Sequence, residues 1–330
     1  MISNKRIVFV YDLLHPLHVK FMKSVGCDFT PLSQKIPKKY EIYIVEGTYI
    51  KPILMRKIGK ISRDKKIVTL ISDPRLFYLS IGKKFDFKRE IIVKYPKFRS
   101  LIAKRLLKEL DGVICTSELT ASLFRKFNKK SPLMITPGFV FKESFKKISK
   151  IKPNLSNKNI LFIGYGPDFY CKGLDLLIES FKEVKKKIPD ANLYILGRWK
   201  IKKEWVYEGV HFEGEQNVLH YLKKCSLSVH LGRGEAFGIN ILETMLAGIP
   251  TLVSEYTGAK QVVKIADKKL VIPLKRDIVV KRVVDYFKSS LNYKERLSKK
   301  CKKTAKEFNE EKILKEFKKN FTGFIKQIRN

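Results

Sequence analysis

The most informative part of the chain runs from Gly234 to Val263 and joins a polar loop to an apolar helix. A first carboxylate, Glu235, lies in the loop, and a second, Glu243, lies among Ile, Leu and Met residues in the helix predicted over 239–247. A helix that is apolar on all sides is typical of a protein interior. A carboxylate on such a helix is costly to bury unless a hydrogen-bond donor meets it. Glu243 therefore requires a partner, either ligand hydroxyls such as those of a ribose or an internal salt bridge, unless it lies at the edge of the helix.

The junction between this loop and helix also predicts an anion site. Gly238 directly precedes the helix, and Gly248 with Pro250 gives the signals of its end. The first amides of a helix have no partner within it and carry a partial positive charge, which suits a diphosphate. A glycine at the junction lets such a ligand approach the backbone closely.

A lysine upstream has a position suited to the same ligand. Lys172 lies between a strand predicted to end at Gly164 and a helix predicted from about Leu174 to Lys187. A lysine there can neutralise a leaving phosphate as negative charge develops in the transition state. Considered alone, a lysine in so basic a chain is more typical of solvated surface charge.

These segments together resemble the donor-binding signature of family-4 glycosyltransferases of the GT-B fold. In that signature two glutamates separated by seven residues flank an aromatic-glycine pair, as Glu235 and Glu243 flank Phe237-Gly238. The stretch KGLDLLIESF from Lys172 resembles the motif whose lysine contacts the donor diphosphate. The resemblance implies that Glu235 holds hydroxyls of the donor sugar and that Glu243 holds the nucleotide ribose.

The chain departs from the family pattern at one cation. The family places an arginine a few residues before the lysine, whereas residues 164–171 contain none. Either Arg198, just after a strand, or Arg233, close to Glu235, supplies the second cation, or the site works with less charge; we favour Arg198. We predict Lys172 and Glu235 as catalytic residues within a donor site made of Gly164, Lys172, Arg198, Glu235, Phe237, Gly238, Ile239, Asn240 and Glu243.

The first half of the chain matches the family less closely. The segment 111–127 and the ITPG that follows it resemble the strand, helix and strand that close the acceptor domain. The family's glycine-rich first loop is here DLLHPLHVKF, and its His-Asp pair is here Ser72-Asp73. The candidates for the acceptor side or the cleft are therefore His15, His18 and Asp73, although each histidine is alternatively structural or exposed. The other histidines are interpreted as structural, with His230 nearest to the donor loop.

Short apolar runs that alternate with helical segments position these residues. We predict strands over 7–11, 42–45, 67–71, 112–116, 159–164, 192–197, 227–231 and 251–254. Such alternation indicates parallel sheets with crossover helices, and ligands of doubly wound sheets bind at the carboxyl ends of the strands. The expected fold class is α/β, and the resemblance implies GT-B, with two Rossmann-like domains around an interdomain cleft and a C-terminal amphipathic helix.

The domain boundaries follow breaks in this pattern. We predict an acceptor domain over 1–141, a lysine-rich linker over 142–158, a donor domain over 159–309 and a terminal helix over 310–330. The length of 330 residues fits two domains, and a hydrophobic content of 44% excludes global disorder.

The charge and the cysteines bear on partners and compartment. The net charge of +37 predicts acidic partners, but its spread along the chain disfavours a dedicated nucleic-acid module. Five widely spaced cysteines without metal-type spacing favour a reduced cytoplasm. The chain has no apolar stretch of transmembrane length, so we expect any membrane contact to be peripheral.

We therefore expect a retaining transferase that uses a UDP- or GDP-sugar as co-substrate and a glycan or lipid-linked acceptor. It should need no cofactor and no metal, because the sequence has no Asp-x-Asp motif and no clustered Cys/His set. Alternatives are a non-catalytic homologue acting as a partner subunit, a nucleic-acid-binding protein, and an epimerase or hydrolase on the same fold.

A further hypothesis concerns an anionic membrane surface at the inner face of the membrane. The segment 51–66 places Ile53, Leu54, Ile58 and Ile61 among seven basic residues. A cationic amphipathic helix can lie in the interface of an anionic bilayer. The segment 97–110 is also basic and apolar, but we expect it to pack on the first sheet.

Overall fold

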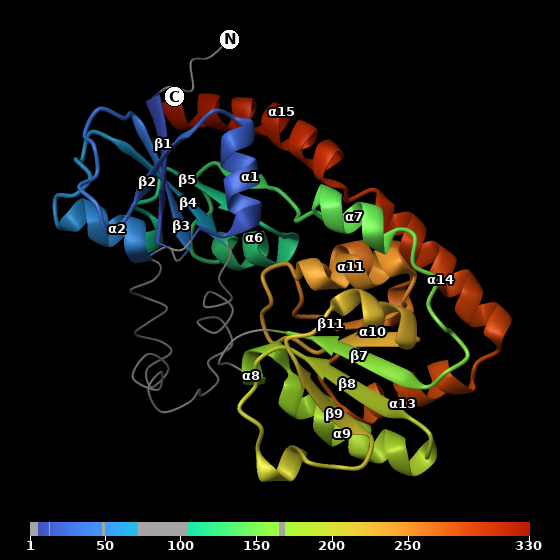
Figure 1. Ribbon diagram of the computed structural model, residues 1–330. Coiled ribbons are helices and arrows are strands. Elements are labelled where there is room, and N and C mark those ends of the chain that lie inside the picture. The colour runs from blue at the N-terminus through green and yellow to red at the C-terminus, as the bar shows by residue number, and fades with distance from the viewer. Residues whose placement is uncertain (1–5, 13, 48–49, 72–104, 165–168) are drawn as a thin grey trace. The chain divides into compact units, whose positions relative to one another are not determined.

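The computed structural model describes residues 6–12, 14–47, 50–71, 105–164 and 169–330 of the chain (Figure 1). They form two compact units, one made of Met1–Gly138 with Glu311–Asn330 and the other of Phe139–Glu310. Each unit has a parallel sheet of six strands covered by helices. Each sheet is therefore the centre of its own hydrophobic core.

The first unit is built on a sheet with the strand order β2-β1-β3-β4-β5-β6. Its strands are rich in Val, Ile and Leu and largely buried, as expected for parallel strands covered on both faces. The chain passes from β1 to β2 on one side and returns to β3 on the other, so the winding reverses between β1 and β3. The strands are β1 Ile7–Tyr11, β2 Asp28–Pro31, β3 Ile42–Gly47, β4 Lys66–Ile71, β5 Gly112–Cys115 and β6 Leu133–Ile135.

The C-terminal helix completes the first unit although it follows the second unit in sequence. Helix α15, Glu310–Arg329, packs Phe317 on Phe21 with ring centroids 4.6 Å apart. A Cβ atom added to Gly112 would lie 2.2 Å from Ile328 Cδ1, so the glycine makes room for the helix. Further helices of this unit are α1 Pro16–Ser24, α2 Ile50–Lys57 and α6 Glu118–Arg125.

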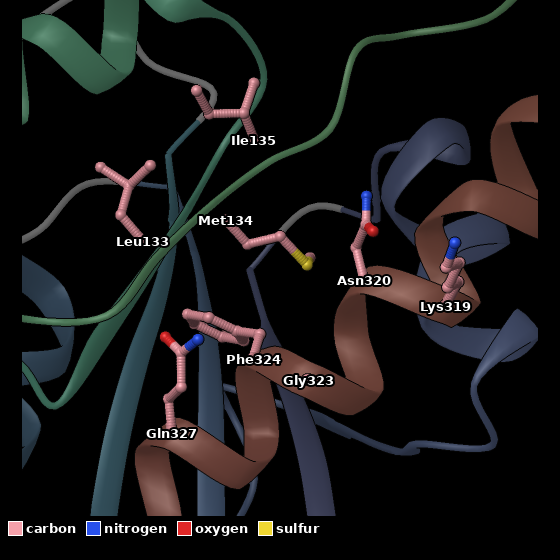
Figure 2. A pocket seen from close by; sticks show the side chains of 8 residues that line it. All are labelled: Leu133, Met134, Ile135, Lys319, Asn320, Gly323, Phe324 and Gln327. Atoms are coloured by element: carbon pink, nitrogen blue, oxygen red, sulfur yellow. The ribbon is translucent and has the colours of Figure 1, made fainter.

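A pocket of about 380 Å³ lies between α15 and the edge strand β6 (Figure 2). Leu133 and Ile135 line it from the strand, and Phe324 and Gln327 line it from the helix. This pocket is remote in sequence from every residue predicted to do chemistry.

The second unit is built on a sheet with the strand order β12-β11-β10-β7-β8-β9. The chain runs outward from β7 to β9 and then crosses to β10 on the other side of β7, so the winding reverses between β7 and β10. Such a reversal opens a crevice at the carboxyl ends of the two strands. The strands are β7 Asn159–Ile163, β8 Asn192–Leu196, β9 Val210–Gly214, β10 Leu227–His230, β11 Thr251–Ser254 and β12 Val271–Ile272.

Helices cover both faces of this second sheet (Figure 1). Helices α9 and α13 contact each other on one face, and α11 contacts α7, α10 and α14 on the other. The helices are α7 Lys142–Ile148, α8 Phe169–Lys172, α9 Leu174–Lys187, α10 Val218–Lys224, α11 Ile239–Ala247, α12 Lys260–Ala266, α13 Arg276–Lys288 and α14 Leu291–Lys306.

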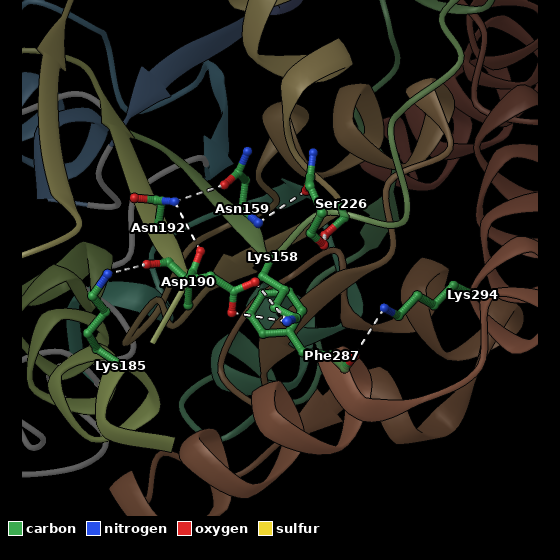
Figure 3. Close-up of polar contacts among 10 residues, drawn as sticks. Lys158, Asn159, Lys185, Asp190, Asn192, Ser226, Phe287 and Lys294 are labelled. Atoms are coloured by element: carbon green, nitrogen blue, oxygen red, sulfur yellow. Dashed lines mark hydrogen bonds and ion pairs between the residues drawn. The ribbon is translucent and has the colours of Figure 1, made fainter. Parts of the chain in front are cut away.

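Polar side chains tie together the amino-terminal edge of the second sheet (Figure 3). The Asn192 amide donates to Asn159 at 3.3 Å, and the Asn159 amide donates to the Lys224 carbonyl at 2.9 Å. Lys158 pairs with Asp190 at 2.8 Å beside them. These groups satisfy one another, which contrasts with the opposite edge, where the candidate ligand groups gather.

The structure confirms the eight predicted strands, with shifts of one or two residues at some ends. The segment predicted as a linker, 142–158, instead begins with helix α7 and belongs to the second unit. The predicted terminal helix exists, but Glu311–Asn330 belongs to the first unit. The terminal helix belongs to the first unit because its apolar side chains pack on residues far from it in sequence. Phe317, Phe324 and Ile328 are buried against that unit.

Candidate functional site

The carboxyl-terminal edge of the second sheet collects the predicted donor residues. Gly164 follows β7, Gly197 and Arg198 follow β8, and the loop after β10 carries Glu235. This is the edge where the winding of the sheet reverses, and ligands of doubly wound sheets bind there.

Lys172 and Glu235 form an ion pair at this edge, between the ammonium and Oε2 of the carboxylate. Their side chains are 28% and 16% exposed, so the pair is partly screened from water but still reachable by a ligand. Burial opposes ionisation of Glu235, but the charge of Lys172 and the adjacent His230 outweigh it and hold the pKa of this carboxyl well below its usual range. Glu235 is therefore a carboxylate at neutral pH, able to accept hydrogen bonds from hydroxyl groups.

The backbone around Glu235 is held by the segment that follows β11. Glu235 and Thr257 form an isolated parallel bridge, and the Gly258 amide donates to the Glu235 carbonyl at 2.8 Å. The Ala259 amide donates to the Phe237 carbonyl at 2.9 Å. The side chain of Phe237 is buried in the hydrophobic core, so this residue anchors the loop through both its ring and its backbone.

Gly173 fixes the position of Lys172. It has a φ of +72° at the junction of α8 and α9, and a Cβ atom added to it would lie 1.9 Å from the Leu231 carbonyl oxygen. Only glycine fits such a left-handed conformation in so close an approach. The turn therefore presses the end of α8 against the segment that follows β10, which brings Lys172 to Glu235.

The two arginines predicted as alternative second cations differ in their surroundings. Arg233 binds both oxygens of Asp175 at 2.7 and 3.1 Å and donates to the Tyr170 carbonyl at 2.6 Å. It is only 14% exposed and ties the loop to α8 and α9. Arg198 is 82% exposed and pairs with Glu215 at 2.6 Å. Arg198 is therefore the more accessible of the two for a ligand, and its role stays a prediction.

Helix α11 begins at the same edge. Gly238 has a φ of +94°, and a Cβ atom added there would lie 2.8 Å from Ile241 Cδ1, so the sharp entry into the helix requires glycine. The Asn240 side-chain amide donates to the Ile163 carbonyl at 2.5 Å, which ties the helix start to the end of β7. The first amides of the helix, those of Ile239 and Asn240, lack partners within it.

Glu243 lies one turn further along α11 and differs from Glu235 in its electrostatics. Burial raises the pKa of Glu243 to about 7. Among the described residues, the structure shows no hydrogen bond and no ion pair to this carboxylate. The internal salt bridge considered from the sequence is thus not observed in that part of the chain, and the requirement for a partner remains.

The first unit carries a separate cluster where its own sheet reverses. His18 on α1 is hydrogen-bonded through Nδ1 to Glu46 at the end of β3, and both are buried. His15 lies beside His18 with ring centroids 4.8 Å apart. Burial lowers the pKa of His15, the neighbouring His18 lowers it further, and Glu46 opposes the change. Asp73, the third acceptor candidate, lies outside the described residues.

The segment 51–66, predicted to meet a membrane as an amphipathic helix, is helical only as far as the end of α2 at Lys57, and part of its apolar side is buried. Ile53 and Ile61 are buried, whereas Leu54 and Ile58 are 53% and 57% exposed. Within the described ranges, no helix has the length and hydropathy to cross a bilayer.

Residues 145–308, about half of the chain, match the model of the family Glycosyl transferases group 1. The chain belongs to this family. The matched residues include Lys172, Glu235 and Glu243 and end near the boundary between α14 and α15.

Curated relatives of this group 1 glycosyltransferase are distant. The uncharacterized glycosyltransferase MJ1059 of Methanocaldococcus jannaschii is 25% identical over 228 residues, which are 64% of this chain and 53% of the relative. The lipopolysaccharide glucosyltransferase WaaG of Escherichia coli is 28% identical over 122 residues, which are 34% of this chain and 33% of WaaG. The chain thus spans about half the length, or less, of the curated relatives it matches.

Solved structures share the GT-B fold with the chain. Sucrose-phosphate synthase from Thermosynechococcus elongatus has a TM-score of 0.71 at 13% identity, covering 97% of this chain and 99% of that one. The Anabaena protein HepE in complex with UDP and glucose has a TM-score of 0.69 at 14% identity, covering 96% and 99%. WaaG has a TM-score of 0.62 at 16% identity, covering 96% and 100%.

The structure brings together part of the donor site predicted for this glycosyltransferase. Lys172 and Glu235 are in contact, and Gly238 and Asn240 adjoin the same edge, whereas Arg198 faces solvent. Among the described residues, no group of three or more His, Cys, Asp or Glu side chains has metal-site geometry. Glu46 was not predicted from the sequence, and His230 was interpreted as structural, although the run LSVHL places that histidine at the end of a strand, at the donor edge.

Proposed function

We propose that this group 1 glycosyltransferase transfers a sugar from a UDP- or GDP-sugar to a glycan or lipid-linked acceptor, with retention of anomeric configuration. The observation that carries the proposal is the Lys172–Glu235 ion pair beside the N-terminus of α11, at the edge where the second sheet reverses. This arrangement combines a cation for a diphosphate with a carboxylate for sugar hydroxyls.

The parts of a nucleotide sugar correspond to groups at this edge. The diphosphate suits Lys172 and the first amides of α11, because both present positive charge. The ribose suits Glu243, whose partly buried carboxylate gains hydrogen bonds from the two hydroxyls. The fold similarity to HepE, whose structure contains UDP and glucose, supports a uridine nucleotide as the first donor to test.

The reaction needs no protein nucleophile in this proposal. The bond from the anomeric carbon to the diphosphate breaks, a bond to the acceptor oxygen forms on the same face, and the acceptor proton moves to the leaving phosphate oxygen. Lys172 stabilises the charge that develops on that phosphate, and Glu235 orients the sugar through its hydroxyls. The protein thus acts by positioning and by electrostatic stabilisation.

A thermal-stabilisation screen with UDP-, GDP- and ADP-sugars tests the donor. A ligand that binds only the folded state raises the melting temperature, and the increase grows with the logarithm of its free concentration relative to its dissociation constant. We expect nucleotide sugars of one base to give an increase that grows with their concentration, and those of the other two bases to give little. No increase with any nucleotide sugar at millimolar concentration would contradict the proposal.

A non-catalytic homologue is the second candidate, and one observation favours it. The family arginine is missing before Lys172, and Arg233, which lies close to Glu235, is already bound to Asp175. Release of nucleoside diphosphate from the selected donor over many hours distinguishes the candidates. A subunit without turnover would bind the nucleotide sugar and leave it intact.

We also propose that the first unit contacts an anionic membrane surface and takes a membrane-adjacent acceptor. The support is Leu54 and Ile58, which are exposed near the exposed basic residues Lys57, Lys60 and Arg63. The rest of the +37 charge is spread along the chain and supports no specific nucleic-acid site.

A further inference from the structure

His230 lies beside Glu235 and carries a buried ring nitrogen. It is the last residue of β10, and its side chain is 3% exposed. Its Nε2 atom is buried and has no hydrogen-bond partner in the part of the chain that the structure describes. A buried polar atom without a partner is costly, so its presence calls for an explanation.

The nearest acceptor for this nitrogen is the carboxylate of Glu235. His230 Nε2 lies 3.6 Å from Glu235 Oε2, just beyond hydrogen-bond distance. The same oxygen accepts from the Lys172 ammonium. Two groups, the Lys172 ammonium and His230 Nε2, therefore face one carboxylate oxygen, and Lys172 is the one that binds it.

The surroundings fix the ring and leave the carboxylate free to shift. The imidazole is stacked on Phe162 of β7, with ring centroids 5.9 Å apart and an interplanar angle of 13°. Gly232 lies beneath both groups, and a Cβ atom added to it would lie 3.1 Å from Glu235 Cβ and 3.3 Å from His230 Nε2. A change of well under one ångström in the carboxylate would therefore complete the hydrogen bond.

We propose that His230 is a positioning residue that holds Glu235 for the donor sugar once a diphosphate draws Lys172 away. This inference rests on the proposed donor site. When Lys172 moves to the diphosphate, Glu235 loses its counter-charge at a position where its side chain is only 16% exposed. The hydrogen bond from His230 Nε2 then stabilises the carboxylate and directs its other oxygen toward the sugar hydroxyls.

Two substitutions separate this role from simple packing. His230→Phe keeps a flat ring against Phe162 but removes the donor, whereas His230→Gln places an amide N–H near the position of Nε2. The measurement is the ratio of the dissociation constants for UDP and UDP-glucose, obtained by calorimetry for each protein. GDP and GDP-mannose replace them if the screen selects guanine.

We expect the ratio of the dissociation constant for UDP to that for UDP-glucose to be about tenfold smaller in His230→Phe than in wild type. In His230→Gln we expect most of the wild-type ratio to be restored. An unchanged ratio in His230→Phe would overturn the role of His230 and leave the proposed donor site intact. A wild-type protein that binds none of these nucleotides would instead remove the proposed function and this role with it.

A measurement on the wild-type protein tests the proposal even if His230→Phe folds poorly. Nitrogen NMR of the histidine side chains reports whether Nε2 carries a proton and a hydrogen bond, and the chain has only five histidines to assign. Addition of UDP-glucose should shift the Nε2 resonance that is missing in His230→Gln. A resonance that stays unchanged at saturating UDP-glucose would contradict the proposal.

Discussion

Lys172 and Glu235 lie 63 positions apart in sequence and form an ion pair at the carboxyl-terminal edge of the second sheet. The pair exists because Gly173 presses against the Leu231 carbonyl and because the loop after β10 is held by Thr257 and Gly258. Two local sequence motifs are thus joined by backbone contacts that neither motif contains.

Lys172→Ala should weaken binding of the selected nucleoside diphosphate by about ten- to a hundredfold. The loss corresponds to one charge-assisted hydrogen bond of roughly 1.5–3 kcal/mol. Calorimetry or fluorescence titration measures it. The control is Lys186→Ala on α9, whose ammonium pairs with Glu183 on the surface at 2.9 Å. Equal affinities in wild type and both variants would exclude Lys172 from the donor site.

Gly173→Ala should destabilise the second unit far more than Gly214→Ala. Both glycines have a positive φ, of +72° and +69°, but a Cβ atom meets the Leu231 carbonyl at 1.9 Å only at Gly173 and finds nothing within 4 Å at Gly214. We expect Gly214→Ala to cost about 1 kcal/mol and Gly173→Ala on the order of 3 kcal/mol or more. Denaturant unfolding measures both, and similar losses would show that the close approach to Leu231 is unimportant.

The strands and the central donor helix could be predicted because their signals are local. Runs such as Ile7–Tyr11 and Asn159–Ile163 are apolar and bounded by polar residues, and the helix Ile239–Ala247 was predicted with its observed bounds. Strands such as Asp28–Pro31 and Val210–Gly214 escaped prediction because they are short, at sheet edges and partly polar.

Packing between distant segments could not be predicted in the same way. Nothing in the local sequence of Glu310–Arg329 indicates that this helix belongs to the first unit, where Gly112 makes room for it. The position of His230 near the donor loop was predicted, but its approach to Glu235 was not, because a histidine within an apolar strand gives no sign of the carboxylate that folding brings to 3.6 Å.

Glu243→Gln should make the stability of the protein less dependent on pH. Burial raises the pKa of Glu243 to about 7 in the folded protein, above its value in the unfolded chain. The folded state therefore holds the proton more tightly, and the free energy of unfolding should fall as pH rises from about 4.5 to about 7. Glutamine does not titrate, so the free energy of unfolding of the variant should fall less over this pH range.

The comparison is made by urea unfolding at several pH values between 4 and 8. At pH 8 the Gln variant should be more stable than wild type by about 1–3 kcal/mol. Glu295→Gln, at an exposed glutamate of α14, is measured in parallel as a control for the exchange of glutamate for glutamine. The opposite sign, with wild type gaining stability toward pH 8 relative to Glu243→Gln, would show that a cation stabilises Glu243.

Activity with the selected donor should survive chelation by EDTA. The sequence offers no Asp-x-Asp pair to bridge a cation to the diphosphate, and Lys172 with the α11 amides supplies positive charge in its place. Release of nucleoside diphosphate before and after EDTA treatment checks this. Loss of release that Mg²⁺ or Mn²⁺ restores would contradict it.

Leu54→Glu with Ile58→Glu should abolish binding to anionic vesicles. Lys51, Arg56, Lys65 and Lys66 already face carboxylates, so the exposed cations near these two side chains are Lys57, Lys60 and Arg63. At about 1 kcal/mol for each cation near the surface, three of them and two inserted apolar side chains give weak, reversible binding.

Sedimentation with vesicles of phosphatidylcholine and increasing phosphatidylglycerol measures this binding. Wild type should sediment with anionic vesicles at low salt and be released as salt rises, because the attraction is screened. Ile201→Glu, which alters an exposed apolar residue of the second unit, is the control and should behave as wild type. Wild type that stays in the supernatant at low salt with strongly anionic vesicles would rule out the membrane contact. If Ile201→Glu lost vesicle binding as fully as the double variant, added negative charge alone would explain the effect.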